Sequence, residues 1–113
     1  MRKIEWTSEG MDSLNEILEY YKDRAGEYVA NSIYDKIIKE IDLLELEEIK
    51  TRQTQDLKNI GIFGVYEISI KPWKVYYKIS DDYKTIHILF VLDGRRNLEE
   101  ILISKVIDQK LKP

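Results

Sequence analysis

The first residues of the chain alternate polar and apolar side chains, which is the period of a β-strand. Residues 2–6 therefore predict a short strand with one apolar face. Thr7 and Ser8 follow, and a hydroxyl at this position accepts hydrogen bonds from the free N–H groups of a first helical turn. We expect a helix to begin here, with Gly10 as a weak point near its start.

Two stretches with helical period come next, separated by a break at residues 23–26 (DRAG). In both stretches apolar side chains recur at the spacing of one helix face, and polar side chains fill the other face. Two amphipathic helices with a short connection predict an antiparallel helical hairpin. The apolar positions are Leu14, Ile17, Leu18 and Tyr21 in the first stretch, and Ala30, Ile33, Tyr34, Ile37, Ile41 and Leu44 in the second.

Strand character returns in the second half of the chain. Residues 63–70 and 73–79 predict two strands joined by a turn at Pro72, which has no N–H to donate to a sheet. After a polar turn at residues 80–84, residues 85–92 form the most apolar run, which is typical of a central strand covered on both faces. Consecutive strands with short turns imply an antiparallel meander.

The remaining segments complete the predicted order of elements. Residues 45–59 are mostly polar, and we interpret them as the end of the second helix plus a surface loop, or as an edge beside a functional groove. Asn97 is a candidate cap for a last helix over residues 97–110. The order β-α-α-β-β-β-α predicts a single α+β domain, residues 1–113, with the helical hairpin packed on a small, mostly antiparallel sheet.

The composition narrows the class of protein. The 113 residues are 43% hydrophobic and 35% charged, which suits one globular domain. The formal net charge of −3 differs from the strongly basic balance of a domain that binds a phosphate backbone. The chain has no cysteine, which excludes disulfides, thiolate metal sites and a cysteine nucleophile. No apolar run has the length of a membrane helix, and we expect a cytoplasmic protein that does not contact membranes.

Most motifs that carry known chemistry are missing. There is no Gly-rich phosphate loop and no nucleophile elbow, so we expect no small-molecule cofactor. The lone histidine, His87, cannot build a histidine metal site, and we interpret it as an ordinary strand residue. We therefore expect no bound metal.

One segment does combine cations with aromatic rings. On a strand, Lys74, Tyr76 and Lys78 share one face, while Trp73 and Tyr77 point to the other. A face that carries amines and a phenol suits phosphate contact with base stacking, or an acidic protein surface. The alternative is an ordinary solvated strand.

A pair of arginines follows the most apolar strand. Arg95 and Arg96 come directly after Gly94, where we expect the glycine to supply a backbone conformation that other residues avoid. A guanidinium group can clamp a phosphate or a carboxylate with two parallel hydrogen bonds. This turn is therefore the second candidate binding feature, unless the pair is simply a solvated turn.

With these features the chain resembles the RelE/ParE toxin superfamily of type II toxin–antitoxin modules. The resemblance covers most of the chain and rests on the order of elements and on three segments: GVYEISI (64–70), WKVYYKI (73–79) and VLDGRRNLEEIL (91–102). It implies a small toxin that arrests growth and that a cognate antitoxin holds inactive by wrapping its helices and sheet.

The superfamily has two functional branches. RelE-like members cut mRNA on the ribosome, whereas ParE-like members poison DNA gyrase and are not known as nucleases. Matched to the nuclease branch, Lys74 falls where that branch places a strand arginine, and Arg96 falls on the arginine of the following turn. Asp93 replaces the family's turn histidine, and residues 97–103 contain no tyrosine or histidine, so Glu67 is the remaining candidate base.

Those departures favour the ParE-like branch. RNA cleavage needs a general acid and base, whose removal costs on the order of 10²–10⁴ in rate. We therefore expect a toxin that binds gyrase through Arg95 and Arg96, with Trp73, Lys74 and Tyr76 as further contacts. The alternatives are a RelE-like endoribonuclease acting through Lys74, Arg96 and Glu67, or an inactive relative that only binds the antitoxin.

Overall fold

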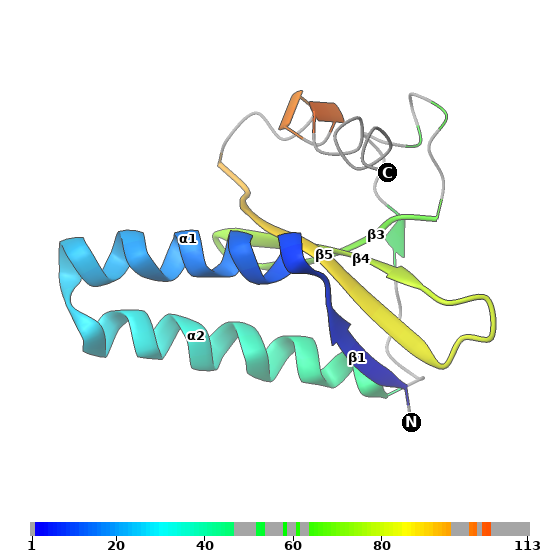
Figure 1. The fold of residues 1–113 in the computed structure, drawn as a ribbon, viewed down its shortest axis with the longest axis horizontal. Coiled ribbons are helices and arrows are strands. Elements are labelled where there is room, and N and C mark those ends of the chain that lie inside the picture. Colours follow the sequence, from blue (N-terminus) through cyan, green and yellow to red (C-terminus); the bar gives the residue numbers. More distant parts are fainter. Residues whose placement is uncertain are drawn as a thin grey trace.

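The computed structural model describes residues 2–46, the backbone of residues 52–53, and residues 58, 61, 64–95, 100–101 and 103–104. Figure 1 shows a helical hairpin beside a curved sheet. The elements are β1 (Lys3–Trp6), α1 (Ser8–Ala25), α2 (Glu27–Asp42), the 3₁₀ turn η1 (Leu43–Glu45), β2 (Arg52–Gln53), β3 (Tyr66–Ile70), β4 (Trp73–Ile79) and β5 (Thr85–Asp93).

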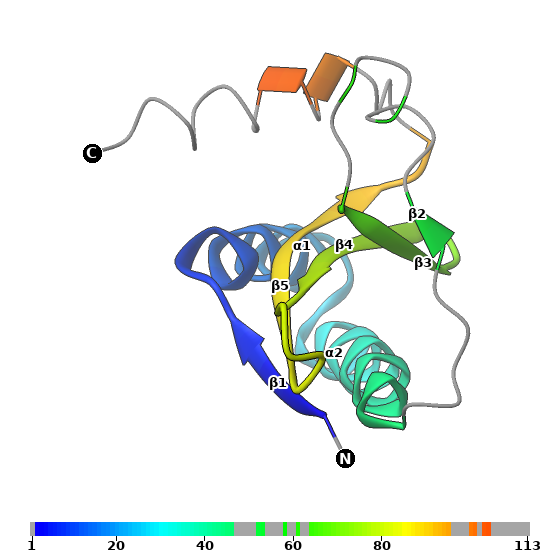
Figure 2. The same ribbon diagram turned by 90° about the vertical axis from the view of Figure 1, so that its right-hand side faces the viewer.

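The sheet confirms the predicted fold class. Its strand order is β1-β5-β4-β3-β2, in which β1 runs parallel to β5 and the other neighbours are antiparallel. The helices lie on one side of the β3–β4–β5 ribbon, and the described C-terminal residues lie on the other side (Figures 1 and 2). Strand β5 is an interior strand between β1 and β4, in agreement with the covered strand that the apolar run over residues 85–92 predicts.

The helical hairpin begins and ends close to where the sequence indicates. Thr7 is the N-cap of α1, and its hydroxyl oxygen accepts a hydrogen bond from the Gly10 N–H at 3.0 Å. Gly26 ends α1 and precedes α2 with a φ of 93°, a left-handed conformation that favours glycine. A single glycine is therefore the whole connection between the two helices.

The polar stretch between α2 and β3 contains more structure than predicted. Arg52 and Gln53 pair with Glu67 and Tyr66, so the short edge strand β2 lies within the segment interpreted as a helix end and loop. Two residues are too few to show a strand period in the sequence. Strand β3 begins at Tyr66, later than the predicted start at residue 63.

The last predicted helix is described only in part. Glu100, Ile101, Ile103 and Ser104 are helical, as expected, and the rest of residues 97–110 lies outside the described part of the chain. In the described residues no helix is both long enough and apolar enough to cross a membrane.

The core consists of two apolar clusters on opposite faces of the sheet. The larger one joins the helices to the sheet through Leu14, Ile37, Ile41, Val75 and Val91, among others. The smaller one, which we call the outer cluster, consists of Val65, Tyr76, Leu89, Phe90 and Leu92, with Ile101 packed against it. Strand β5 contributes to both clusters, which confirms that both of its faces are covered.

Hydroxyl groups at the start of α1 form hydrogen bonds with the backbone of β5 where β1 ends. The pairing of β1 with β5 stops at Ile88, whose carbonyl accepts hydrogen bonds from the Thr7 N–H at 3.1 Å and the Thr7 hydroxyl at 2.8 Å. Further along, buried Ser13 donates to the Gly10 carbonyl and accepts from the Val91 N–H, both at 2.9 Å. The N-cap and first turns of α1 thus satisfy backbone groups of β5 next to and beyond the end of β1.

Gly10 lies at the closest approach of α1 to β5. A Cβ at this position would be 2.5 Å from the Ile88 carbonyl oxygen, a distance that real Cβ atoms do not reach. The sequence indicated only a weak point in a helix. The structure gives the residue a packing role, because the absence of a side chain allows the helix to rest on the strand backbone.

Arg2 secures the other end of the hairpin. Its side chain is buried and donates to the carbonyls of Leu44 and Leu46, both at 3.0 Å, while its N–H donates to the Glu45 carbonyl at 2.9 Å. These are carbonyls that the end of a helix leaves without partners. The residue before β1 therefore caps the turn that follows α2.

Replacing Ser13 by alanine is expected to destabilise the fold by about 1–3 kcal/mol, because the buried Val91 N–H loses its acceptor. Urea unfolding measures the loss. Ser32→Ala is the matched control, since the Ser32 hydroxyl also bonds to a helix carbonyl but is exposed, and its effect should stay within about 0.5 kcal/mol. Equal effects of the two variants would contradict the role given to Ser13.

Gly10→Ala is expected to lower the melting temperature although alanine favours helices. The helix gains roughly 0.5–1 kcal/mol from the substitution, whereas overpacking against the strand backbone costs roughly 1–3 kcal/mol. Asn15→Ala, at an exposed position of the same helix, provides the comparison and should not destabilise. A Gly10→Ala protein that melts at the same or a higher temperature would disprove the close contact.

Candidate functional site

Lys74 and Glu67, which the sequence places in the nuclease alternative, form an ion pair on neighbouring strands. The Lys74 Nζ lies 3.7 Å from the Glu67 Oε2, and the accessible fractions of the two side chains are 31% and 9%. Strand β4 brings the amine alongside β3, whose carboxylate is nearly covered. Lys74 is therefore partly engaged inside the molecule.

Trp73 and Tyr76, two of the expected target contacts, are both buried. Their exposed fractions are 5% and 0%. Tyr76 lies in the outer cluster with its ring centroid 5.5 Å from that of Phe90. The strand pattern predicts that Tyr76 shares a solvated face with Lys74, and this is wrong because that face is itself a packed layer. Trp73 lies in the core on the opposite face, as the same pattern predicts. Lys78, on the same strand, is exposed as expected.

Trp73 faces the helices. Its ring meets the edge of Tyr21 at a centroid distance of 6.0 Å, and the Lys36 Nζ lies 6.0 Å from its centroid. The Lys36 amine also donates to the Lys71 carbonyl at 3.1 Å, which keeps this side chain over the indole. Trp73 thus forms part of the wall between the hairpin and β4.

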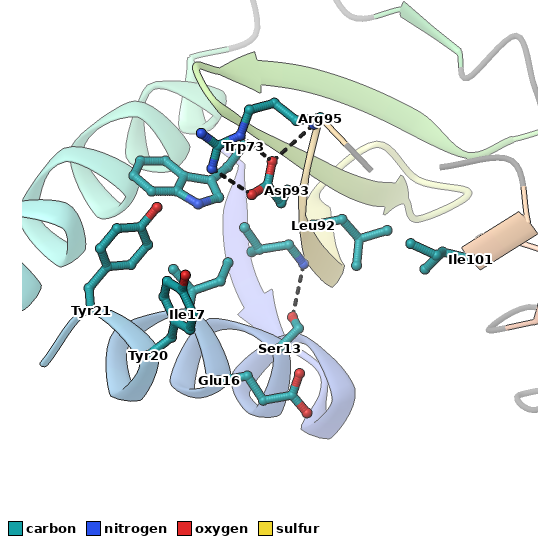
Figure 3. Close-up of a pocket in the computed structure, with 11 residues that line it drawn as sticks. Ser13, Glu16, Ile17, Tyr20, Tyr21, Trp73, Leu92, Asp93, Arg95 and Ile101 are labelled. Carbon is teal, nitrogen blue, oxygen red and sulfur yellow. Dashed lines mark hydrogen bonds and ion pairs between the residues drawn. The ribbon is translucent and has the colours of Figure 1, made fainter. Parts of the chain in front are cut away.

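Arg95 is held by Asp93, two residues before it. The Arg95 Nε and Nη2 donate to the two Asp93 carboxylate oxygens at 3.0 and 2.7 Å, and the Arg95 backbone N–H donates to Oδ1 at 2.9 Å (Figure 3). Hydrogen bonds from this guanidinium to Asp93, and then to Tyr21, raise the pKa of Arg95. The side chain is 67% accessible but already has a bidentate carboxylate partner.

Sequence reasoning missed this role of Asp93, which it treated only as a substitute for a histidine. An Asp-Gly-Arg turn directly after a strand is the signal that could have suggested it, because an aspartate side chain readily accepts from the N–H two residues later. Arg96, the other half of the predicted pair, lies outside the described residues.

Gly94 is required in this turn because there is no room for a side chain. A Cβ on Gly94 would lie 2.9 Å from the Pro72 carbonyl oxygen, and the Gly94 N–H donates to that same oxygen at 2.7 Å. The φ of Gly94 is not in the left-handed region, so the expected backbone reason is wrong. The close approach ties the Arg95 turn to the β3–β4 turn.

A cavity of about 510 Å³ opens between α1 and the end of β5. Figure 3 shows Tyr20, Tyr21 and Trp73 along one side, with the Asp93–Arg95 pair next to the indole and Ile101 across from the helix. Its remaining lining residues are Ser13, Glu16, Ile17, Val91 and Leu92. The cavity combines aromatic rings, a fixed ion pair and a helix carboxylate, and we call it the aromatic cavity.

Exposed large apolar side chains gather on the hairpin. Five of them lie on α1, on α2 or in η1, where we expect antitoxin contacts from the family resemblance. They are Met11, Tyr20, Tyr28, Tyr34 and Leu43, with exposed fractions between 42% and 84%.

The charged side chains of the sheet give no sign of a metal centre. Among the described residues no group of three or more His, Asp or Glu side chains could hold a metal ion. His87 is half-buried in β5, with its Nδ1 3.5 Å from a Glu5 carboxylate oxygen on β1. This is the ordinary strand position that the sequence predicts.

Comparison with known proteins places these features in a family. A family model described as the ParE toxin of the type II toxin–antitoxin system parDE matches residues 4–98. A comparison with curated proteins finds no match.

Two solved structures have a similar fold. One is from the chromosomal ParDE toxin–antitoxin system of P. aeruginosa, with a TM-score of 0.68, 18% identity, and coverage of 82% of this chain and 96% of that one. The other is the isolated E. coli RelE toxin, with a TM-score of 0.50, 12% identity, and coverage of 94% and 99%. At these identities the likeness concerns the fold.

Asp93→Ala is expected to release the Arg95 guanidinium without unfolding the protein, because the pair is largely exposed. The Arg95 Nε–H, followed by ¹⁵N NMR, should then exchange faster with water. Asp81→Ala, in the exposed turn between β4 and β5, provides the control and should leave that signal unchanged. Unaltered Nε–H exchange in Asp93→Ala would mean that the carboxylate does not hold the guanidinium in solution.

Proposed function

Because the chain belongs to the ParE toxin family of type II toxin–antitoxin systems, we propose that it inhibits DNA gyrase and that a cognate antitoxin neutralises it. The observation that carries this proposal is the match of the ParE family model to residues 4–98, which include the sheet, the hairpin and the Arg95 turn. The ParDE structure named above, solved for a complete toxin–antitoxin system, supports the expectation of an antitoxin partner.

The chemistry of the outer face also supports binding over catalysis. Attack by a ribose 2′-hydroxyl needs a base near the hydroxyl and an acid near the leaving oxygen. The nearly covered Glu67 carboxylate is paired with Lys74. Lysine side chains are in general poor acids at neutral pH. A target-binding role makes no such demand on these groups.

The turn after β5 is the proposed contact with the target. Asp93 fixes the Arg95 guanidinium with two hydrogen bonds, so this side chain loses little conformational entropy when it meets a partner. Arg95 keeps donors beyond those that Asp93 uses, because a guanidinium carries five N–H groups. Arg96 follows directly in the sequence and adds a second cation.

The second candidate function is RelE-like cleavage of mRNA on the ribosome. Its motivation is the sequence match of Lys74 and Arg96 to the nuclease branch. The structure adds that Lys74 and Glu67 lie together on one face of the sheet, although their ion pair engages the carboxylate that would act as the base. Primer extension on translated mRNA would show cuts that disappear in Lys74→Ala. Intact mRNA on translating ribosomes would exclude this function.

Purified toxin is expected to inhibit DNA supercoiling by gyrase, and Arg96→Ala to raise the concentration for half-inhibition by roughly 10- to 100-fold, as for a lost hydrogen bond to a charged group. Arg95→Ala should have a smaller effect, since Asp93 already uses two donors. Arg24→Ala, on the far end of α1, serves as the arginine control and should inhibit like the parent. Unaffected gyrase at high toxin excess would rule out the proposed target.

A further inference from the structure

Helix α1 carries the negative charge of the molecule. It contains five carboxylates against two cations, so its excess of acidic groups equals the formal charge of −3 of the whole chain. Four of the carboxylates, Asp12, Glu16, Glu19 and Asp23, are spaced at i, i+4, i+7 and i+11 and therefore share one helix face. We call this row the acidic stripe.

The carboxylates of the acidic stripe form no ion pair within the described structure. None of its four side chains takes part in an ion pair or a hydrogen bond among the described residues. The two cations of α1 are used elsewhere: Lys22 lies 3.7 Å from Glu27 of α2, and Arg24 lies over the Tyr20 ring at 4.5 Å. Like charges at this spacing destabilise a helix, so folding gives no reason for the stripe.

The stripe lies on an open, only slightly hollowed surface of α1. This surface consists of the four carboxylates, Asn15 and Tyr20. It adjoins the aromatic cavity, because Glu16 and Tyr20 line both. Figure 3 shows Glu16 and Tyr20 on the helix below this cavity. Tyr20 is 51% exposed between this surface and the aromatic cavity and offers an aromatic face to a partner.

We propose that the toxin-binding segment of the antitoxin is basic: its Lys or Arg side chains lie along the acidic stripe, and an apolar side chain enters the aromatic cavity. This inference rests on the proposed neutralisation by an antitoxin and adds the chemistry of the partner. The charge of the stripe favours a basic protein segment as its partner, since four unpaired carboxylates attract cations and repel nucleic acid. The Arg95 cation does not reverse this attraction, because Asp93 neutralises it.

The test uses the full-length toxin and the protein encoded by the adjoining reading frame, with affinity measured by calorimetry at low and high salt. Glu16→Gln/Glu19→Gln is expected to bind roughly 3- to 30-fold more weakly at low salt, as for two lost surface ion pairs, and to show a smaller salt dependence. Tyr20→Ala is expected to lose roughly 30-fold or more, as for an aromatic anchor in a cavity.

The matched control removes the same charge from the other helix. Asp35→Asn/Glu40→Gln changes two exposed carboxylates of α2 that have no ion pair in the described structure, and its affinity should match that of the parent within about twofold. If both double variants bind the antitoxin equally weakly, the loss of affinity follows from net charge alone, and the proposal is overturned. Unchanged binding by both Glu16→Gln/Glu19→Gln and Tyr20→Ala would also overturn it.

Two further measurements separate the possible failures. Without antitoxin, the Glu16→Gln/Glu19→Gln toxin should inhibit gyrase as strongly as the parent toxin does. If neither the parent nor the variant inhibits gyrase, the proposed target is wrong, and the antitoxin-binding surface is not affected by that result. Sedimentation of the toxin alone tests a second copy as occupant. A dimer that the Glu16→Gln/Glu19→Gln change disrupts would assign the stripe to self-association and overturn the antitoxin proposal.

Discussion

The hydrogen bonds between the start of α1 and the outer edge of β5 hold the two layers of this fold in register. Strand β1 covers only the first part of β5, and the hydroxyls of Thr7 and Ser13 then provide the partners of the strand backbone. An open strand edge invites pairing with another chain, and a helix that covers it prevents this. The same contact sets the distance between α1 and the end of β5, where the aromatic cavity opens.

Most elements could be predicted from the sequence because their signals are local. The helical stripes, the Gly26 break and the apolar run of β5 each depend on neighbouring residues, and the structure confirms them. Contacts between distant segments left no such signal. The burial of Arg2 under the carbonyls of η1 and the role of Gly10 both depend on residues more than forty positions away.

The candidate site was predicted less well for a related reason. The alternation along β4 correctly separated the faces of the strand, but it could not tell a solvated face from one packed against the outer cluster, so Tyr76 was assigned to the surface. The two arginines after β5 could be identified as a candidate binding feature from the sequence. The hydrogen bonds between Arg95 and Asp93 depend on the geometry of the turn, which the sequence does not give. Charge patterning on α1 was visible in the sequence, but its lack of ion pairs within the described structure required the positions of the neighbouring side chains.

The single-glycine link between α1 and α2 has a consequence for the order of assembly. Contacts inside the hairpin join residues close in sequence, while the pairing of β1 with β5 closes a loop from Lys3 to Thr85. Short loops close early and long ones late, so the helices are expected to meet before the sheet is completed. During synthesis the hairpin leaves the ribosome well ahead of β5, and the surface of α1 is thus available to another protein before the sheet that bears the Arg95 turn exists.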